Sequence, residues 1–392
     1  MGARFPDATP RFVRALSTAE TQIRLAPSTS KIAAKDSSWT KCEQFCQQEK
    51  VNKFLVGIAD PIAYLLVFAV LYREGSASKS GNTVRASTVD DVLRDISQKM
   101  AELGYTDYRL LPNGHLDYRL SQLKKSWNKA DPPPERVQPV SLAILRELCR
   151  IAGSDNFGIA IRDLSIIGFY FLCRPGEIYA PVSAESDSAP FRLCDTEFLV
   201  GTAYYRADSI PIHLLQSAAS VRLEFTTQKN CNRGEKIVHA TSGDPLLCPV
   251  RATAARVRHL RAHAATKSTT PLFQVFDAKA PTSLPVYARH ITAALQQAAT
   301  NIAGTTGINP HCITARSLRP GGATALLCAR CDRDTIKLVG RWKSDAMIRY
   351  LHTQAAPAMA HLAPAMLKHG HFTFSPAAVV PQQALPILTT AS

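Results

Sequence analysis

The sequence predicts a mainly α-helical protein with a small antiparallel β-sheet in its C-terminal half. Apolar residues recur at helical spacing on both sides of a proline-rich segment, KADPPPERVQP. By contrast, VRLEFTTQ and EKIVHA alternate apolar and polar residues around NCNRG, a pattern typical of a β-hairpin. A chain of 392 residues is long enough for two domains, so we expect the prolines to separate an all-α domain from a mixed α+β domain.

The N-terminal half contains three segments. Residues 1–36 are basic and rich in Ala, Ser and Thr, and we expect a disordered arm, with an organelle-targeting signal as the alternative. Residues 37–130 predict four helices, of which the third has Ser87 or Thr88 as its N-cap and Gly104 at its C-terminus. Residues 131–139 form the linker, because three consecutive prolines exclude a helix.

The C-terminal half, residues 140–374, is expected to form one domain followed by a flexible tail at residues 375–392. Beside the hairpin, apolar periodicity predicts a set of helices. Their expected ranges are 140–152, 158–172, 249–264, 287–302, 320–329 and 332–338.

The net charge of +15 favours a polyanionic partner, since each neutralised phosphate releases counterions. Nucleic acid is the first expectation and an acidic membrane surface the second. The apolar run at residues 59–72 is fourteen residues long and includes Asp60 and Pro61, whereas a membrane span needs about 20 apolar residues. We therefore expect no insertion into a membrane.

The ten cysteines are scattered, and no secretory signal precedes them. This distribution is typical of reduced thiols in a nuclear or cytoplasmic protein. Cys328 and Cys331 have no second pair at zinc-site spacing, so we interpret them as packing residues on one helix face. We expect neither a metal nor another cofactor.

Arginines mark the candidate site. Arg319 opens a helix whose first turn carries Gly321 and Gly322, which would let a phosphate approach the backbone. In FYFLCRPGEIYA, Arg174 is followed after three residues by Glu177, whose carboxylate would hold the guanidinium in one orientation. A buried structural ion pair is the alternative. Two guanidinium groups can bind both non-bridging oxygens of one phosphate.

The C-terminal half contains five features in this order: R-x-x-E after an apolar helix, a Lys-bearing hairpin, SLRPGGAT, GRW and a Tyr. On these features it resembles the catalytic domain of the tyrosine recombinases, or phage-integrase-like proteins. The sequences SLRPGGATALL and GRWKSDAMIRYL are most similar to those of recombinase-like proteins encoded by eukaryotic mobile elements. The resemblance covers about residues 37–370. It implies that residues 37–130 are a SAM-like core-binding domain that contacts DNA and that residues 140–374 are the catalytic domain.

The resemblance also implies roles for individual residues. Arg174 and Arg319 would clamp the phosphate, with Glu177 supporting the first. Lys229 would be the general acid, with Lys236 as the competing choice. The remaining roles are a phosphate-binding indole at Trp342 and a nucleophile at Tyr350 that forms a 3′-phosphotyrosyl link. These residues define a DNA strand transferase that needs no cofactor.

Two positions depart from the family pattern. Arg316 stands where the family has His, and an arginine cannot act as a base near neutral pH. Tyr350 follows Trp342 by eight residues, where about nine is usual, whereas Arg341 does lie nine residues before it. Arg341 is therefore the alternative to Trp342. The competing hypotheses are a DNA-binding protein that retains the fold without catalysis and a relative of type IB topoisomerases.

The resemblance further implies that the partner is double-stranded DNA, bound by a homotetramer whose protomers exchange the residues after Leu351. Basic residues near the end of the first domain and on one helix of the second are the expected phosphate contacts. They are Lys124, Lys125, Arg251, Arg256 and Arg258.

Overall fold

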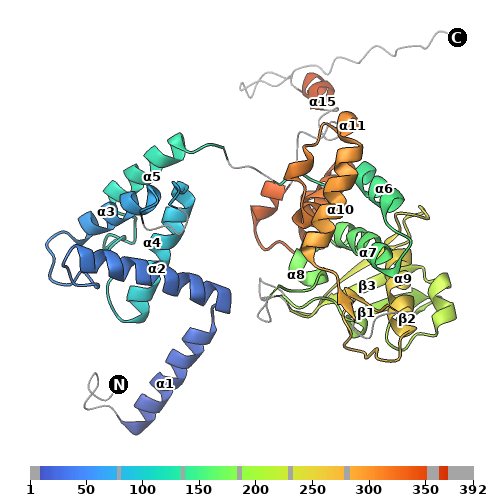
Figure 1. The fold of residues 1–392 in the computed structure, drawn as a ribbon, viewed down its shortest axis with the longest axis horizontal. Coiled ribbons are helices and arrows are strands. Elements are labelled where there is room, and N and C mark those ends of the chain that lie inside the picture. The colour runs from blue at the N-terminus through green and yellow to red at the C-terminus, as the bar shows by residue number, and fades with distance from the viewer. Residues whose placement is uncertain are drawn as a thin grey trace, which may run out of the picture. The chain divides into compact units, whose positions relative to one another are not determined.

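The computed structural model describes residues 9–76, 81–133, 137–182, 188–227, 233–277, 283–350 and 362–369. The chain forms two compact units (Figure 1). Unit 1 comprises residues 1–135 and 183–186, and unit 2 comprises residues 136–182 and 187–392. The protein is mainly α-helical with a small antiparallel sheet, as predicted.

Unit 1 is all-α among its described residues. Its helices are α1 (Pro10–Leu25), α2 (Thr29–Gln48), α3 (Pro61–Arg73), α4 (Ala86–Glu102) and α5 (Tyr118–Ala130). Helices α2 to α5 enclose one apolar core that includes Trp39, Phe68 and Ile96. Disorder was predicted for residues 1–36, and this is wrong for α1, whose N-cap Thr9 accepts a hydrogen bond from the backbone N–H of Phe12.

The N-terminus of α4 differs from the prediction. The helix begins at Ala86, before the expected caps Ser87 and Thr88, and the N–H of Ala86 donates to Asp131 Oδ2 at 2.7 Å. The other carboxylate oxygen of Asp131 accepts from Arg73 Nη2 at 2.6 Å. Asp131, which follows α5, therefore accepts a hydrogen bond from a backbone N–H that has no partner within α4. Gly104 follows the helix with φ +82°, as predicted for its C-terminus.

Unit 2 contains the helices predicted for it. They are α6 (Leu142–Ile151), α7 (Asn156–Tyr170), α8 (Pro175–Ile178), α9 (Pro249–Arg261), α10 (Ala288–Asn301), α11 (Ala303–Thr306), α12 (Leu318–Cys328), α13 (Arg333–Gly340) and α15 (Leu362–His369), of which α8, α11 and α15 were not predicted. Helix α7 is buried on nearly all sides and contacts α9 and α12. The C-terminal half of α7 is thus the centre of the unit. The tail predicted at residues 375–392 lies outside the described residues.

The main sheet has four antiparallel strands in the order β2-β1-β3-β4. Its strands are β1 (Thr196–Val200), β2 (Ala203–Arg206), β3 (Ser220–Phe225) and β4 (Glu235–Ala240), and a second sheet pairs β5 (Gln274–Val275) with β6 (Leu284–Pro285). The predicted hairpin is confirmed as β3 and β4. Val221, Leu223 and Phe225 point from β3 into the core, as a period of two requires.

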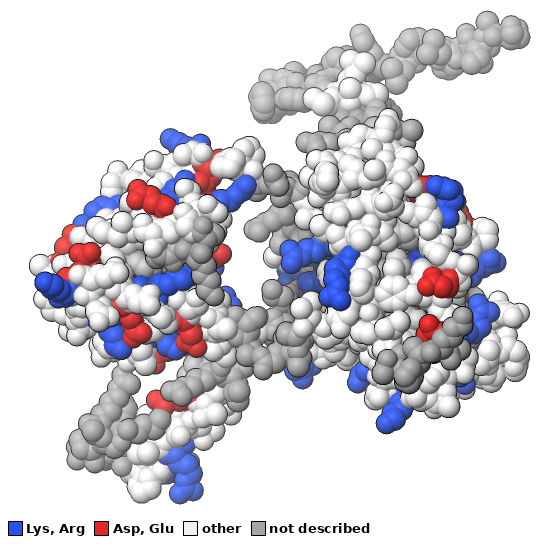
Figure 2. Space-filling view, viewed as in Figure 1, with Lys and Arg blue, Asp and Glu red and all other residues white. Residues whose placement is uncertain are grey.

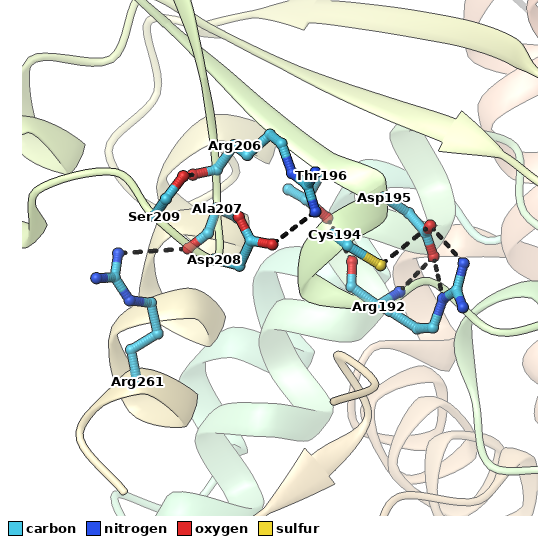
Figure 3. Close-up of polar contacts among 9 residues, drawn as sticks. All are labelled: Arg192, Cys194, Asp195, Thr196, Arg206, Ala207, Asp208, Ser209 and Arg261. Carbon is cyan, nitrogen blue, oxygen red and sulfur yellow. Dashed lines mark hydrogen bonds and ion pairs between the residues drawn. The ribbon is translucent and has the colours of Figure 1, made fainter. Parts of the chain in front are cut away.

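Polar contacts fix the beginning of the sheet (Figure 3). Arg192 holds Asp195 through two side-chain hydrogen bonds of 2.8 Å, and Arg206 pairs with Asp208 at 2.7 Å. Arg261, at the end of α9, donates to the carbonyl oxygen of Ala207 at 3.4 Å. The last of these bonds ties the residue that follows β2 to α9.

Among the described residues, no helix combines the length and hydropathy that a membrane crossing requires.

Candidate active site

The site is built on the C-terminal end of α7. The chain leaves this helix through Leu172, which has φ +48°. The carbonyl groups at the end of the helix have no partner within the helix, and they attract cations. Leu172 O accepts hydrogen bonds from Arg319 Nη1 at 2.6 Å and from Arg341 Nη2 at 3.2 Å, and Phe171 O accepts from Arg341 Nη1 at 3.2 Å. Two arginines from distant parts of the sequence thus meet at one helix end.

Glu177 connects this pair to Arg174. Arg174 is the N-cap of α8, and Glu177 lies in the first turn. The carboxylate, 1% exposed, accepts from the Arg174 N–H at 2.7 Å, from Arg174 Nη1 at 2.9 Å and from Arg341 Nη2 at 2.9 Å. One buried carboxylate is therefore shared by two guanidinium groups, which supply the opposite charge that a buried anion needs.

Arg341 lies entirely in the interior. Its side chain is 0% exposed, and its guanidinium carbon lies 3.5 Å from the centre of the Phe225 ring. Burial lowers its pKa, and the Glu177 carboxylate opposes that effect. In this structure the side chain of Arg341, the alternative to Trp342 at the phosphate-binding position, does not reach the surface.

Arg319 and Trp342 lie against each other. The guanidinium carbon of Arg319 is 4.3 Å from the centre of the Trp342 ring, and Arg319 Nη2 donates to Gly340 O. Both residues are buried, and Trp342 belongs to a small apolar cluster with Leu172 and Met347. The structure therefore brings the predicted arginine and indole together, but in a position closed to solvent.

The prediction for the two glycines of SLRPGGAT is wrong. A Cβ atom at Gly321 would clash with the carbonyl oxygen of Val140, and one at Gly322 would clash with that of Phe169. The glycines let α12 pack directly on α7 and on Val140, which precedes α6, so no phosphate could approach on that side. Because glycine has no side chain, these two positions allow the helices to pack closely.

Two of the predicted site arginines, Arg174 and Arg316, are at least partly accessible to solvent. The Arg174 side chain is 23% exposed. Arg316 lies on the 3₁₀ helix Ala315–Ser317, which precedes α12, and is exposed. Its N–H donates to Thr314 Oγ1 at 3.2 Å, which fixes the turn. These two arginines have the access to a phosphate that Arg319 and Arg341 lack.

Lys229 lies outside the described residues. Tyr350 ends the 3₁₀ helix Asp345–Tyr350, and its side chain is also outside the description. The competing Lys236 is described: its Nζ lies 3.2 Å from Glu224 Oε2 and 3.6 Å from Glu197 Oε2 on the face of the sheet. Two carboxylates thus hold its ammonium group in an ion-pair network.

Cys173 is a residue of the site that the sequence did not indicate. Its thiol is buried, and burial, followed by the nearby Glu177 carboxylate, raises its pKa, whereas Arg341, Arg319 and Arg174 oppose the shift. The raised pKa keeps the thiol uncharged near neutral pH. Its position directly before Arg174 was the only signal.

The predicted phosphate contact at Arg256 is wrong. Arg256 is 0% exposed, and it donates to the carbonyl oxygens of Leu272, at 3.1 Å from Nε, and of Gln274. Burial lowers its pKa to about 10. The residue ties α9 to β5 and is structural.

The other four predicted contacts are partly or fully accessible. Arg251, Arg258 and Lys125 are exposed, and Lys124 pairs with Asp90 at 2.7 Å. On the face seen in Figure 2, basic and acidic side chains alternate over unit 1, whereas unit 2 shows few acidic ones. The described residues contain no group of three or more His, Cys, Asp or Glu side chains placed to hold a metal ion.

In structure the chain is similar to a lambda integrase dimer bound to a COC′ core site, with 12% identity and a TM-score of 0.47 over 87% of this chain and 95% of that chain. It is also similar to the Tn1549 transposon integrase in complex with circular intermediate DNA, with 12% identity and a TM-score of 0.42 over 82% and 98%. A third similar structure is XerA recombinase, with 14% identity and a TM-score of 0.36 over 86% and 100%. No protein-family model and no curated protein matches the sequence.

Proposed function

We propose that this chain is a DNA strand transferase of the tyrosine recombinase type, derived from a mobile element, which cuts and rejoins DNA through a 3′-phosphotyrosyl intermediate. The observation that carries the proposal is the Glu177 carboxylate, shared by Arg174 and Arg341, beside the Leu172 carbonyl that Arg341 shares with Arg319. The arginines and the glutamate of this cluster belong to the motifs that run, in order, from Arg174 to Tyr350 in the sequence.

The proposed chemistry follows from the charges. A phenol has a pKa of about 10, so Tyr350 needs cationic surroundings to attack as a phenolate near neutral pH. Arg174 and Arg316 are the accessible donors for the phosphate oxygens and for the added charge of the transition state. The phosphotyrosyl ester conserves the energy of the broken bond, so the second strand rejoins without ATP or a metal.

The second candidate is a DNA-binding protein that retains this fold without cleaving DNA. Two observations favour it. Arg319 donates through both Nη atoms to backbone carbonyls, and Arg316 cannot serve as a base where the family has His. In either case we propose double-stranded DNA as the partner, a homotetramer as the assembly on DNA, and the nucleus or cytoplasm as the location.

The test uses nicked DNA duplexes of randomised sequence, which trap covalent complexes because the cleaved end diffuses away. The full chain is incubated with the duplexes, and adducts that survive denaturation are isolated and sequenced. We expect adducts that disappear in Tyr350→Phe and persist in Tyr118→Phe, a matched change at a highly exposed tyrosine of unit 1. Binding without an adduct supports the second candidate, and absence of DNA binding contradicts both.

A further inference from the structure

The contacts around Glu177 form a chain that runs from the interior to the surface. Arg341 is 0% exposed, Glu177 is 1% exposed and Arg174 is 23% exposed, and each contacts the next at 2.9 Å. We propose that Arg341 is a positioning residue, which acts on the bound phosphate only by locking Glu177 in the orientation that holds Arg174. The part of this inference that concerns the reaction rests on the proposed function.

Arg341 is enclosed by its neighbours. The Phe225 ring covers its guanidinium, and the carbonyl oxygens of Phe171 and Leu172 accept from its two Nη atoms. Its backbone is held as well: it ends α13 with φ +56°, and its N–H donates to Leu338 O at 3.0 Å. A left-handed conformation at a non-glycine residue persists only where its surroundings fix it. Because the side chain is 0% exposed, a phosphate oxygen could not reach this guanidinium unless neighbouring residues moved.

Glu177 needs the second arginine because it is buried. Its Oε1 accepts from Arg174 Nη1, while its Oε2 accepts from the Arg174 N–H and from Arg341 Nη2. Without Arg341, Oε2 keeps only a neutral donor, and the buried carboxylate lowers its energy by rotating toward water. That rotation takes Oε1 away from Arg174 Nη1, which then has no fixed acceptor. Orientation of Arg174 thus depends on a residue that never contacts the substrate.

The first experiment needs no DNA target. Phenylglyoxal modifies accessible guanidinium groups, and peptide mass spectrometry measures the rate at Arg174 in the full chain. We expect Arg174 to react several times faster in Arg341→Met than in the wild type, with an intermediate rate in Arg341→Lys, which restores the charge. Arg258, exposed on α9, should react at the same rate in all three. Equal rates at Arg174 would overturn the inference.

The second experiment is a double-mutant cycle on the rate of adduct formation. We expect Arg341→Met to slow the reaction roughly tenfold or more, with the affinity for duplex DNA unchanged. In an Arg174→Ala background the same substitution should have almost no further effect, because the two residues act through one contact chain. Additive losses, or weaker DNA binding with a smaller salt dependence, would mean that Arg341 contacts the phosphate itself.

A third variant separates positioning from folding. Glu177→Gln combined with Arg341→Met removes both buried charges, so neither is left without a partner. It should melt close to the wild type and still form adducts as slowly as Arg341→Met. A wild-type rate in this double variant would contradict the inference. If the wild-type chain itself gives no adduct, the proposed function fails, and the phenylglyoxal rates alone decide whether Arg341 positions Arg174.

Discussion

At the scale of single residues, the interior of unit 2 contains a carboxylate that is only half satisfied, Asp163 on α7. It is buried, its Oδ1 accepts from Arg162 Nε at 2.9 Å, and its Oδ2 has no hydrogen-bond partner among the described residues. Burial raises its pKa to about 6, and Arg162 and the α9 residues Arg256 and Arg258 oppose that shift. An unsatisfied buried oxygen of this kind makes the ionised form costly.

The raised pKa of Asp163 predicts how stability changes with pH. Because the native pKa of about 6 lies above the ordinary value of 3.8, the folded state binds the proton more tightly than the unfolded state. This contribution to stability is fully present below pH 3.8 and is lost as the pH rises to about 6. We expect Asp163→Asn to remove this loss, which amounts to about 2–3 kcal/mol.

Urea unfolding of the full chain at several pH values between 4 and 7 measures this effect. The free energy of unfolding of Asp163→Asn should increase relative to that of the wild type as the pH increases. Asp334→Asn, at an exposed acid of unit 2, is the matched control and should follow the wild type. A difference between wild type and Asp163→Asn that stays constant with pH would contradict the prediction.

At the scale of secondary-structure elements, the packing of α12 on α7 places Arg319 against the carbonyl of Leu172. Gly322 makes that packing possible, since a Cβ there would meet the backbone oxygen of Phe169. We expect Gly322→Ala to lower the stability by about 2–4 kcal/mol, because a backbone atom cannot move aside as a flexible side chain would.

Gly304→Ala is the control for this change. A Cβ at Gly304, on α11, meets nothing within 4 Å, so the substitution should be neutral or stabilising by less than about 1 kcal/mol. Thermal unfolding of both variants measures the comparison. Equal melting temperatures for Gly322→Ala and Gly304→Ala would mean that the two helices adjust freely.

Local patterns predicted most of the elements, and the exceptions have a physical reason. Amphipathic periodicity marks the long helices, and the hairpin shows alternation because one face of β3 is buried. Strands β1, β2, β5 and β6 were not predicted. Strand β2 shows no alternation because all four of its residues are exposed, and β5 and β6 are only two residues long, too short for a pattern. The cap of α4 was also missed, because its partner Asp131 lies 45 residues away.

The same reasoning applies to the site. The spacing of Arg174 and Glu177 indicated their contact because both lie in one helical turn. The burial of Arg341 depends on Phe225 and on the end of α7, and that of Arg256 depends on the carbonyls of Leu272 and Gln274. Neither set of partners is near in the sequence, so an arginine in the interior and one on the surface look alike in the primary structure.

At the scale of the whole molecule, the net charge of +15 is the property that most favours DNA as the partner. Charge alone does not identify the contacts, because many of the basic residues of unit 1 already pair with acids. The ion pairs Lys53 with Glu43, Lys99 with Asp36, and Arg119 with Asp60 are examples. With Arg256 excluded by its burial, four of the predicted contacts remain for a test.

The salt dependence of DNA affinity tests those four. Each phosphate contact that is lost lowers the slope of log K against log salt by about 0.9. We expect Lys124→Gln with Lys125→Gln to remove less than the pair Arg251→Gln with Arg258→Gln, because Asp90 already neutralises Lys124. A control that changes Lys53 and Lys99 to Gln removes the same charge from residues with acidic partners and should leave the slope nearly unchanged. If the control lowers the slope as much as the test pairs do, DNA responds to the total charge of the chain, and none of the four residues is a specific contact.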